Sequence, residues 1–194
     1  MAGHHHAGVL APIWTGAYVG FHGGGNWGSI DFKNIGNSDS SAFFGGGHAG
    51  FNLGFGALVA GIEADLNYDG SSYGYTTGGT IGSVDVDWNA SLRGRVGLPV
   101  GPALLYATAG IAWTEKTLVE TSGGLSSSAS DTFTGVVYGI GAETYVMPNM
   151  SLRLEALRYD YSAKSLSLTG AVNAVQDIDP SDTVIRAGVT FHLN

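Results

Sequence analysis

Acidic and basic side chains that recur at every second residue are the part of this sequence most suited to chemistry. Arg93 and Arg95 lie in one such segment, and Arg153 and Glu155 lie in another. Successive side chains of a β-strand point to opposite faces, so each of these pairs projects from one face of a strand. The residues with this placement are Glu63, Asp65, Arg93, Arg95, Glu143, Arg153, Glu155 and Arg186. If those faces meet in an enclosed space, the charges must pair, and we expect a network of ion pairs.

Two short turns indicate which of these side chains meet. A turn at residues 147–149 places Glu143 opposite Arg153, and we predict an ion pair between them. A second turn, with the sequence PVGP, places Arg95 near Tyr106 on the following segment. Both registers assume that the turn is symmetric about its centre, and a slip in register would change every neighbour.

Two histidines and a carboxylate can bind a transition metal, and the sequence offers one such set. If the loop 28–42 and the turn 54–56 are symmetric, His22, His48 and Glu63 lie side by side across three segments. A row of hydrogen-bonded polar side chains would explain the same residues without a metal. A metal or haem site is therefore an alternative hypothesis, and the main expectation is a protein without a cofactor.

Eight segments with hydrophobic alternation must position these side chains. In each segment one parity is apolar and the other polar, over about ten or more residues, which is the length that a tilted strand needs to cross a bilayer. The segments are 16–27, 43–54, 57–68, 84–98, 103–116, 133–146, 150–161 and 183–193. In the fourth segment the alternation also assigns Asp85 and Asp87 to the polar face. The pattern predicts an all-β protein with eight antiparallel strands.

The connections between these segments alternate in length. The short ones are residues 54–56, 99–102 and 147–149, and the long ones lie near 28–42, 69–83, 117–132 and 162–182. Outer-membrane barrels have short periplasmic turns and longer extracellular loops. The alternation therefore predicts an up-and-down transmembrane barrel with both termini on the periplasmic side.

The composition excludes several other classes of protein. Charged residues make up 12% of the 194 residues, whereas they make up about 25% of an ordinary soluble domain. The net charge of −8 and the absence of a basic cluster exclude nucleic-acid binding. The chain has no cysteine, which excludes disulfides and thiolate chemistry. It also lacks an apolar run of about 20 residues, so a transmembrane helix is excluded.

Large aromatic residues on the apolar parity gather at the loop ends of their segments. They are Trp27, Phe43, Tyr68, Trp88 and Trp113. Such belts mark the membrane interface of transmembrane barrels, whereas a soluble lipocalin-like barrel would show the same alternation turned inside out. We therefore predict a location in the bacterial outer membrane. Residues 14–194 form the barrel domain, and residues 1–13 form an N-terminal periplasmic segment or contain a tag remnant.

Several stretches of the sequence are similar to those of a known family. The most specific are GIEADLNY at residues 61–68 and RGRVG at residues 93–97, within a similarity that runs from Trp14 to the C-terminus. They resemble the porin-like outer-membrane proteins of alphaproteobacteria, the Omp25/Omp31-type family of OmpA-like eight-stranded barrels. The resemblance implies an abundant surface protein that stabilises the envelope and, in pathogens, contacts the host. Such proteins usually end in an aromatic residue that the assembly machinery recognises, whereas here Phe191 precedes the last three residues.

An eight-stranded barrel has an interior that side chains can fill, so we expect a plugged lumen. The expected role is structural and surface-interactive, not enzymatic, with a small-solute channel of the porin class as the alternative. A lipid-modifying enzyme is the least supported class, because no set of Ser, His and acid shares a lipid-facing position. The expected partners are outer-membrane lipid, lipopolysaccharide and the barrel-assembly machinery, while any surface or envelope protein partner is left open.

Arg158 is the exception to the alternation, because it has the apolar parity of its segment. An arginine near the outer end of a strand can extend towards lipopolysaccharide phosphates. Alternatively, a β-bulge turns it into the lumen. The sequence leaves these two placements open.

Overall fold

The computed structural model describes residues 11–32, 36–69, 72–77, 80–122, 125–162, 164–168 and 174–193. The possible tag remnant at residues 4–6 lies outside them, as does most of the N-terminal segment 1–13. A short 3-10 helix, η1 (Ala11–Trp14), precedes the first strand. Within the described residues, no helix is long and apolar enough to span a bilayer.

Eight long strands form a closed antiparallel barrel in which each strand pairs with its neighbours along the chain. They are β1 (Gly16–Phe32), β2 (Gly36–Phe55), β3 (Leu58–Asp69), β5 (Thr80–Val100), β6 (Ala103–Ser122), β7 (Leu125–Met147), β8 (Met150–Tyr161) and β10 (Ala174–His192). The pairing of β1 with β10 closes the sheet. The predicted eight-stranded, up-and-down barrel is confirmed.

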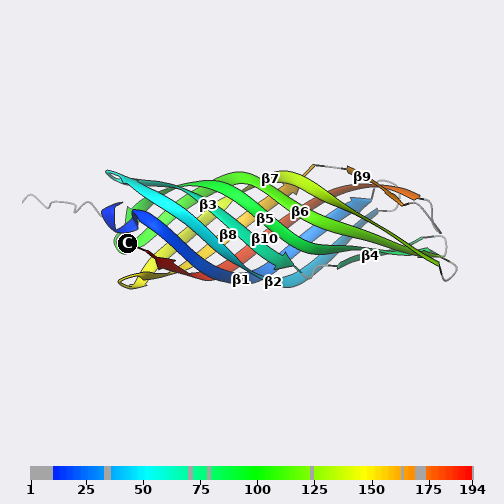
Figure 1. Ribbon diagram of the computed structural model, residues 1–194, viewed down its shortest axis with the longest axis horizontal. Coiled ribbons are helices and arrows are strands. Elements are labelled where there is room, and N and C mark those ends of the chain that lie inside the picture. The colour runs from blue at the N-terminus through cyan, green and yellow to red at the C-terminus, as the bar shows by residue number, and fades with distance from the viewer. Residues whose placement is uncertain are drawn as a thin grey trace, which may run out of the picture.

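The short turns, η1 and the C-terminus lie at one end of the barrel, and the long strand extensions lie at the other (Figure 1). Gly56 and Gly101 occupy two of the short turns with φ of +63° and +62°, a conformation that glycine adopts without steric cost. At the opposite end, β4 (Ser72–Thr77) pairs with β5, and β9 (Lys164–Leu168) pairs with β10. Much of the sequence predicted as long loops therefore continues the strand pairs. For example, β1 and β2 stay paired up to Phe32 and Gly36.

A β-bulge in β5 corrects the prediction for its outer half. The register with β6 shifts between Val86 and Trp88, because one extra residue is inserted there. As a result Val84 is fully buried, and Asp85 falls on the outward parity instead of the lumen side. The side chain of Asp87 lies outside the described residues.

The outer surface of the barrel is apolar over its central part. Large hydrophobic side chains of all eight long strands are exposed there, among them Phe21, Ile62, Val96, Leu105, Ile140, Leu154 and Ile185. In water such a surface would be unstable, whereas it matches the hydrocarbon of a bilayer. The polar parity of the same strands consequently faces the lumen.

Candidate functional site

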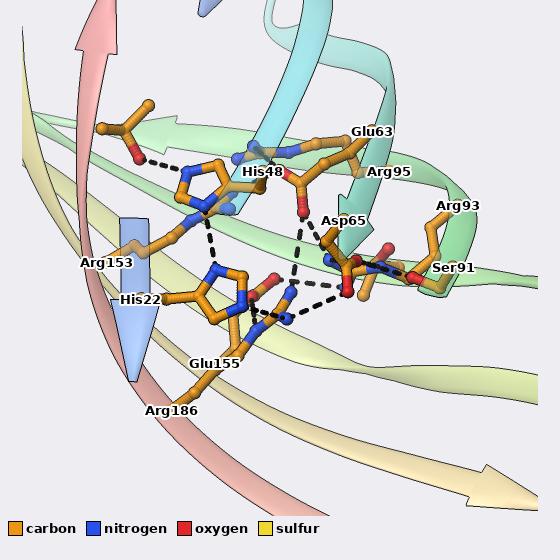
Figure 2. A network of polar contacts seen from close by, with 12 residues as sticks. His22, His48, Glu63, Asp65, Ser91, Arg93, Arg95, Arg153, Glu155 and Arg186 are labelled. Atoms are coloured by element: carbon orange, nitrogen blue, oxygen red, sulfur yellow. Dashed lines mark hydrogen bonds and ion pairs between the residues drawn. The ribbon is translucent and has the colours of Figure 1, made fainter. Parts of the chain in front are cut away.

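Eight charged side chains meet in the middle of the lumen, and all of them except Glu143 are labelled in Figure 2. Four arginines and four carboxylates come from β3, β5, β7, β8 and β10, and none is more than 5% exposed. They are Glu63, Asp65, Arg93, Arg95, Glu143, Arg153, Glu155 and Arg186. We call this set the lumen network. Its formal charges sum to zero, which suits an enclosed site where an uncompensated charge is costly.

Glu63 lies at the centre of the lumen network. Its carboxylate accepts a hydrogen bond from Arg93, and it lies 2.7 Å from Nη2 of Arg153. Arg95 Nη1 is 3.5 Å away and Arg186 Nη2 is 3.8 Å away. One carboxylate thus contacts all four arginines, which come from three different strands.

Asp65 and Glu155 form the extracellular part of the lumen network. Arg186 donates from Nε to Glu155 at 2.7 Å and from Nη1 to Asp65 at 3.3 Å. Arg93 lies 2.9 Å from Asp65 and 3.4 Å from Glu155. The Ser91 hydroxyl donates to Asp65 at 2.6 Å. Each arginine is therefore shared between carboxylates, and the charges form one continuous cluster.

Glu143 belongs to the periplasmic part of the lumen network. It is opposite Arg153 in the register of β7 and β8, and Nη2 of Arg153 lies 3.5 Å from its Oε2. Arg95 donates to the same oxygen at 2.9 Å.

The register expected for Arg95 is wrong. Arg95 is opposite Thr108, because the turn between β5 and β6 is centred one residue later than assumed. Its guanidinium still lies over the ring of Tyr106, with 4.0 Å to the ring centre.

The two lumen histidines contact each other but do not share a site with Glu63. The Nδ1 atoms of His22 and His48 are 3.0 Å apart, and the rings are stacked at 5.3 Å. Nε2 of His22 contacts Asn67 and Arg186, and Nε2 of His48 contacts Thr190 at 3.0 Å. All four ring nitrogens of the two histidines are therefore already in contact with other side chains of the protein.

The predicted metal or haem set is consequently not assembled. The register places His48 opposite Asp65 and Glu63 opposite Gly50, because the turn between β2 and β3 is centred between residues 56 and 57 and not at residue 55. Glu63 contacts arginines instead of imidazole nitrogens. Among the residues that the structure describes, no three His, Cys, Asp or Glu side chains form a metal-binding group.

The indole of Trp14 fills the periplasmic end of the lumen. It is fully buried, lies 4.6 Å from the ring of Tyr145 and 5.7 Å from that of His192, and packs with Val59 and Leu104. The Tyr145 hydroxyl donates to the carbonyl of Ile13 at 2.7 Å and holds η1 in place. The alternation could not reveal this contact, because Trp14 precedes the first strand.

A polar layer lies on the extracellular side of the lumen network. Lys116 is fully buried, with Nζ 3.9 Å from Asp182 and 5.6 Å from the centre of the Tyr161 ring. A space of about 20 Å³ beside it is lined by Asn26, Asn67, Asn89, Thr114, Tyr159 and Asp182, among others. That volume is about the size of one water molecule.

Ser151, His192 and Glu143 approach one another near the periplasmic end, but not as a catalytic triad. The Ser151 hydroxyl donates to Glu143 at 2.6 Å and lies 3.0 Å from Nε2 of His192. The carboxylate is 3.3 Å from that same nitrogen. In a triad the acid binds the other ring nitrogen and orients the imidazole towards the hydroxyl. Here the carboxylate takes the hydroxyl hydrogen bond itself.

The predicted aromatic belt residues all have outward parity. Trp27, Phe43 and Tyr68 are exposed, with Phe43 at 91%, and Trp88 and Trp113 are half-buried. Trp88 donates from its indole nitrogen to Glu115 at 2.6 Å.

Arg158 also faces outward, because the pairing of β8 with β7 and β10 continues through it without a bulge.

Comparison with known proteins agrees with this architecture. The chain matches the outer membrane protein beta-barrel domain family over residues 5–192. It is 34% identical to a 22 kDa outer membrane protein of Rhizobium leguminosarum bv. viciae, over 93% of this chain and 80% of that protein. It is 29% identical to a 25 kDa outer-membrane immunogenic protein of Brucella canis, over 94% and 84% of the two chains. The outer membrane protein OprG of Pseudomonas aeruginosa shares the fold, with a TM-score of 0.57, 14% identity and coverage of 92% and 97%.

The match over nearly the whole chain agrees with the apolar outer surface and the closed barrel, and it includes alphaproteobacterial relatives of the predicted type. The chain therefore belongs to the outer membrane protein β-barrel family and is a protein of the bacterial outer membrane.

Proposed function

We propose that this protein is a structural barrel with a closed lumen, which reinforces the outer membrane and presents its extracellular end to the surroundings. The observation that carries the proposal is the lumen network. Four arginines and four carboxylates, all buried, join five of the eight long strands across the interior. Such cross-links favour a rigid barrel over an open pore.

The lumen network opposes conduction for an energetic reason. A permeating ion would have to separate pairs such as Arg153–Glu63 at 2.7 Å and Arg186–Glu155 at 2.7 Å. Breaking a buried ion pair costs about 3 to 5 kcal/mol when a charge is left uncompensated. The Trp14 indole adds a second obstruction at the periplasmic end. A small-solute channel would require both to move.

A surface role is supported by the extracellular end of the barrel. Polar side chains line the extended β6–β7 hairpin, where Thr117 contacts Ser130 and Thr121 contacts Ser126. Relatives from Brucella are named outer-membrane immunogenic proteins. An extracellular end that is exposed in the same way would make this protein a surface antigen as well.

A nonenzymatic role is part of the proposal. It is supported by the geometry of Ser151 and His192, in which Glu143 competes for the hydroxyl proton. It is also supported by the burial of these groups beneath the Trp14 indole. A reaction would need access for a substrate and a nucleophile free of such a bond.

The test combines ion flux with envelope strength. Lipid vesicles that contain the refolded protein should retain a trapped potassium gradient as long as protein-free vesicles do. A strain without the gene should become sensitive to detergent, and the wild-type gene should restore resistance. Rapid leakage from the vesicles would favour the channel, and unchanged detergent resistance in the deletion strain would contradict the structural role.

A further inference from the structure

Arg158 is a basic side chain on the outside of the barrel. The other basic side chains that the structure describes are all buried in the lumen, namely Arg93, Arg95, Lys116, Arg153 and Arg186. The Arg158 side chain is instead 42% exposed, on the outer surface of the barrel. A cation in such a place is costly unless an anion or the membrane interface accommodates it.

Neighbouring side chains hold the Arg158 guanidinium in a defined position. Its Nε donates to Oδ1 of Asp160 at 3.0 Å, and its Nη1 donates to the Thr183 hydroxyl at 2.9 Å. The Tyr138 hydroxyl donates to the other oxygen of Asp160 at 3.2 Å. Within the part of the chain that the structure describes, Nη2 has no protein partner. A guanidinium that is fixed in this way is well suited to bind a phosphate.

The aromatic neighbours of Arg158 place it near the level of the lipid headgroups. Tyr138, Arg158 and Thr183 are paired across β7, β8 and β10, and Trp27 of β1 is paired with Thr183. All four therefore lie in one row on the outside. Trp and Tyr prefer the membrane interface, and this end of the barrel is the one with the long extensions (Figure 1). Arg158, beside these aromatic residues at the extracellular end, consequently lies in the outer leaflet.

An apolar groove begins directly below this row. The next outward row towards the membrane centre is Ile140, Ala156 and Ile185, which are paired across the same three strands. These residues line a groove of about 780 Å³, together with Ala107, Ala142, Leu154 and others. The small alanines leave a hollow between the larger side chains. A cation thus stands at the headgroup end of a groove that an acyl chain can fill.

We propose that Arg158 and this groove form a specific binding site for a phosphorylated lipid of the outer leaflet, of the lipid A class. The phosphate binds the Arg158 guanidinium and the Thr183 hydroxyl, and an acyl chain lies along Ala156 and Ile140. Asp160 orients the arginine and also repels anions. A free phosphate therefore binds weakly, whereas the phosphate of a lipid is held because its acyl chain binds in the groove. The site is on the outer surface and is independent of whether the lumen conducts.

The test measures lipid binding to the full, refolded chain in detergent micelles by native mass spectrometry. The ligands are diphosphorylated lipid A, the same lipid without its phosphates, and inorganic phosphate as a competitor. The wild-type protein should bind the phosphorylated lipid about tenfold more tightly than the dephosphorylated one, as expected for a charged hydrogen bond. Arg158→Gln should abolish this preference, and Ala156→Leu should weaken the binding of both lipids by filling the groove.

Ala64→Leu is the matched control for the groove, because Ala64 also faces outward but does not line it. It should bind both lipids as the wild type does, and heat-modifiable migration will show that each variant is folded. A folded Arg158→Gln variant that keeps the preference for phosphate would overturn the proposal. Equal effects of Ala156→Leu and Ala64→Leu, or competition by inorganic phosphate at the lipid concentration, would overturn it as well.

Discussion

The lumen and the outer surface of this barrel are built from the same strands but depend on different interactions. In β3, Ile62 and Leu66 are 64% and 60% exposed on the outside, whereas Glu63 and Asp65 are buried in the lumen between them. The outer surface needs only apolar side chains that hydrocarbon can solvate. The lumen needs particular charges at particular positions, because each buried charge depends on a partner. Exchanges among apolar residues should therefore be tolerated outside, whereas the loss of a charge should be penalised inside.

The largest effect is expected where the lumen network loses its central carboxylate. Glu63→Ala would leave four arginines with fewer acceptors, and the free energy of unfolding should fall by about 3 to 5 kcal/mol. Urea unfolding in lipid vesicles, followed by tryptophan fluorescence, would measure the loss. Ile62→Val is the control on the outer face of the same strand, and it should change stability by less than about 0.5 kcal/mol. If the two substitutions lowered the free energy of unfolding equally, the lumen and the outer surface would not differ in their dependence on particular side chains.

A charge on the wrong face should be the next most damaging change. Ala64 lies between Glu63 and Asp65 in sequence but faces the membrane, near the middle of β3. Ala64→Arg should lower the free energy of unfolding by about 2 to 4 kcal/mol, because the arginine would enter hydrocarbon. The same urea titration measures it. A neutral result would show that this face does not contact lipid at that depth.

The smallest effect is expected at the aromatic belt, on the part of the outer surface that lies at the membrane interface. Trp88→Phe removes the hydrogen bond from the indole to Glu115 and should cost about 1 kcal/mol. Tyr68→Phe is the matched control, because Tyr68 is adjacent in the register and also faces outward. Its effect should lie within about 0.5 kcal/mol of zero. If the two variants were equally destabilised, the Trp88–Glu115 bond would contribute nothing specific.

The strands and their two faces could be predicted from the sequence because alternation is a local property. Except in the outer half of β5, the alternation predicts which side chains of each strand face the lumen, such as Glu63 and Arg186, and which face outward, such as Trp27. The strand ends were harder to locate. The segments 117–132 and 28–42 lack a sustained hydrophobic alternation, so the sequence did not predict that the strands continue to pair there as β6–β7 and β1–β2.

Contacts between strands depend on turn geometry, which the sequence defines less well. A turn centre misplaced by one residue moves the partner by two, which separates Arg95 from its expected partner Tyr106 in the register. It likewise places His48 opposite Gly20 instead of His22. The bulge between Val86 and Trp88 reverses the parity of Asp85. Long side chains compensate in part, because Arg95 still reaches Tyr106 diagonally.

The closed lumen is tested most directly by single-channel recording in planar bilayers. The wild-type protein should show no stable, reproducible conductance, because the lumen network and Trp14 obstruct both water and ions. A variant that replaces Glu63, Arg95, Glu143 and Arg153 with serine removes half of the lumen network and should open measurable steps, provided that it migrates as a folded barrel. Stable, reproducible conductance of the wild-type protein would contradict the account.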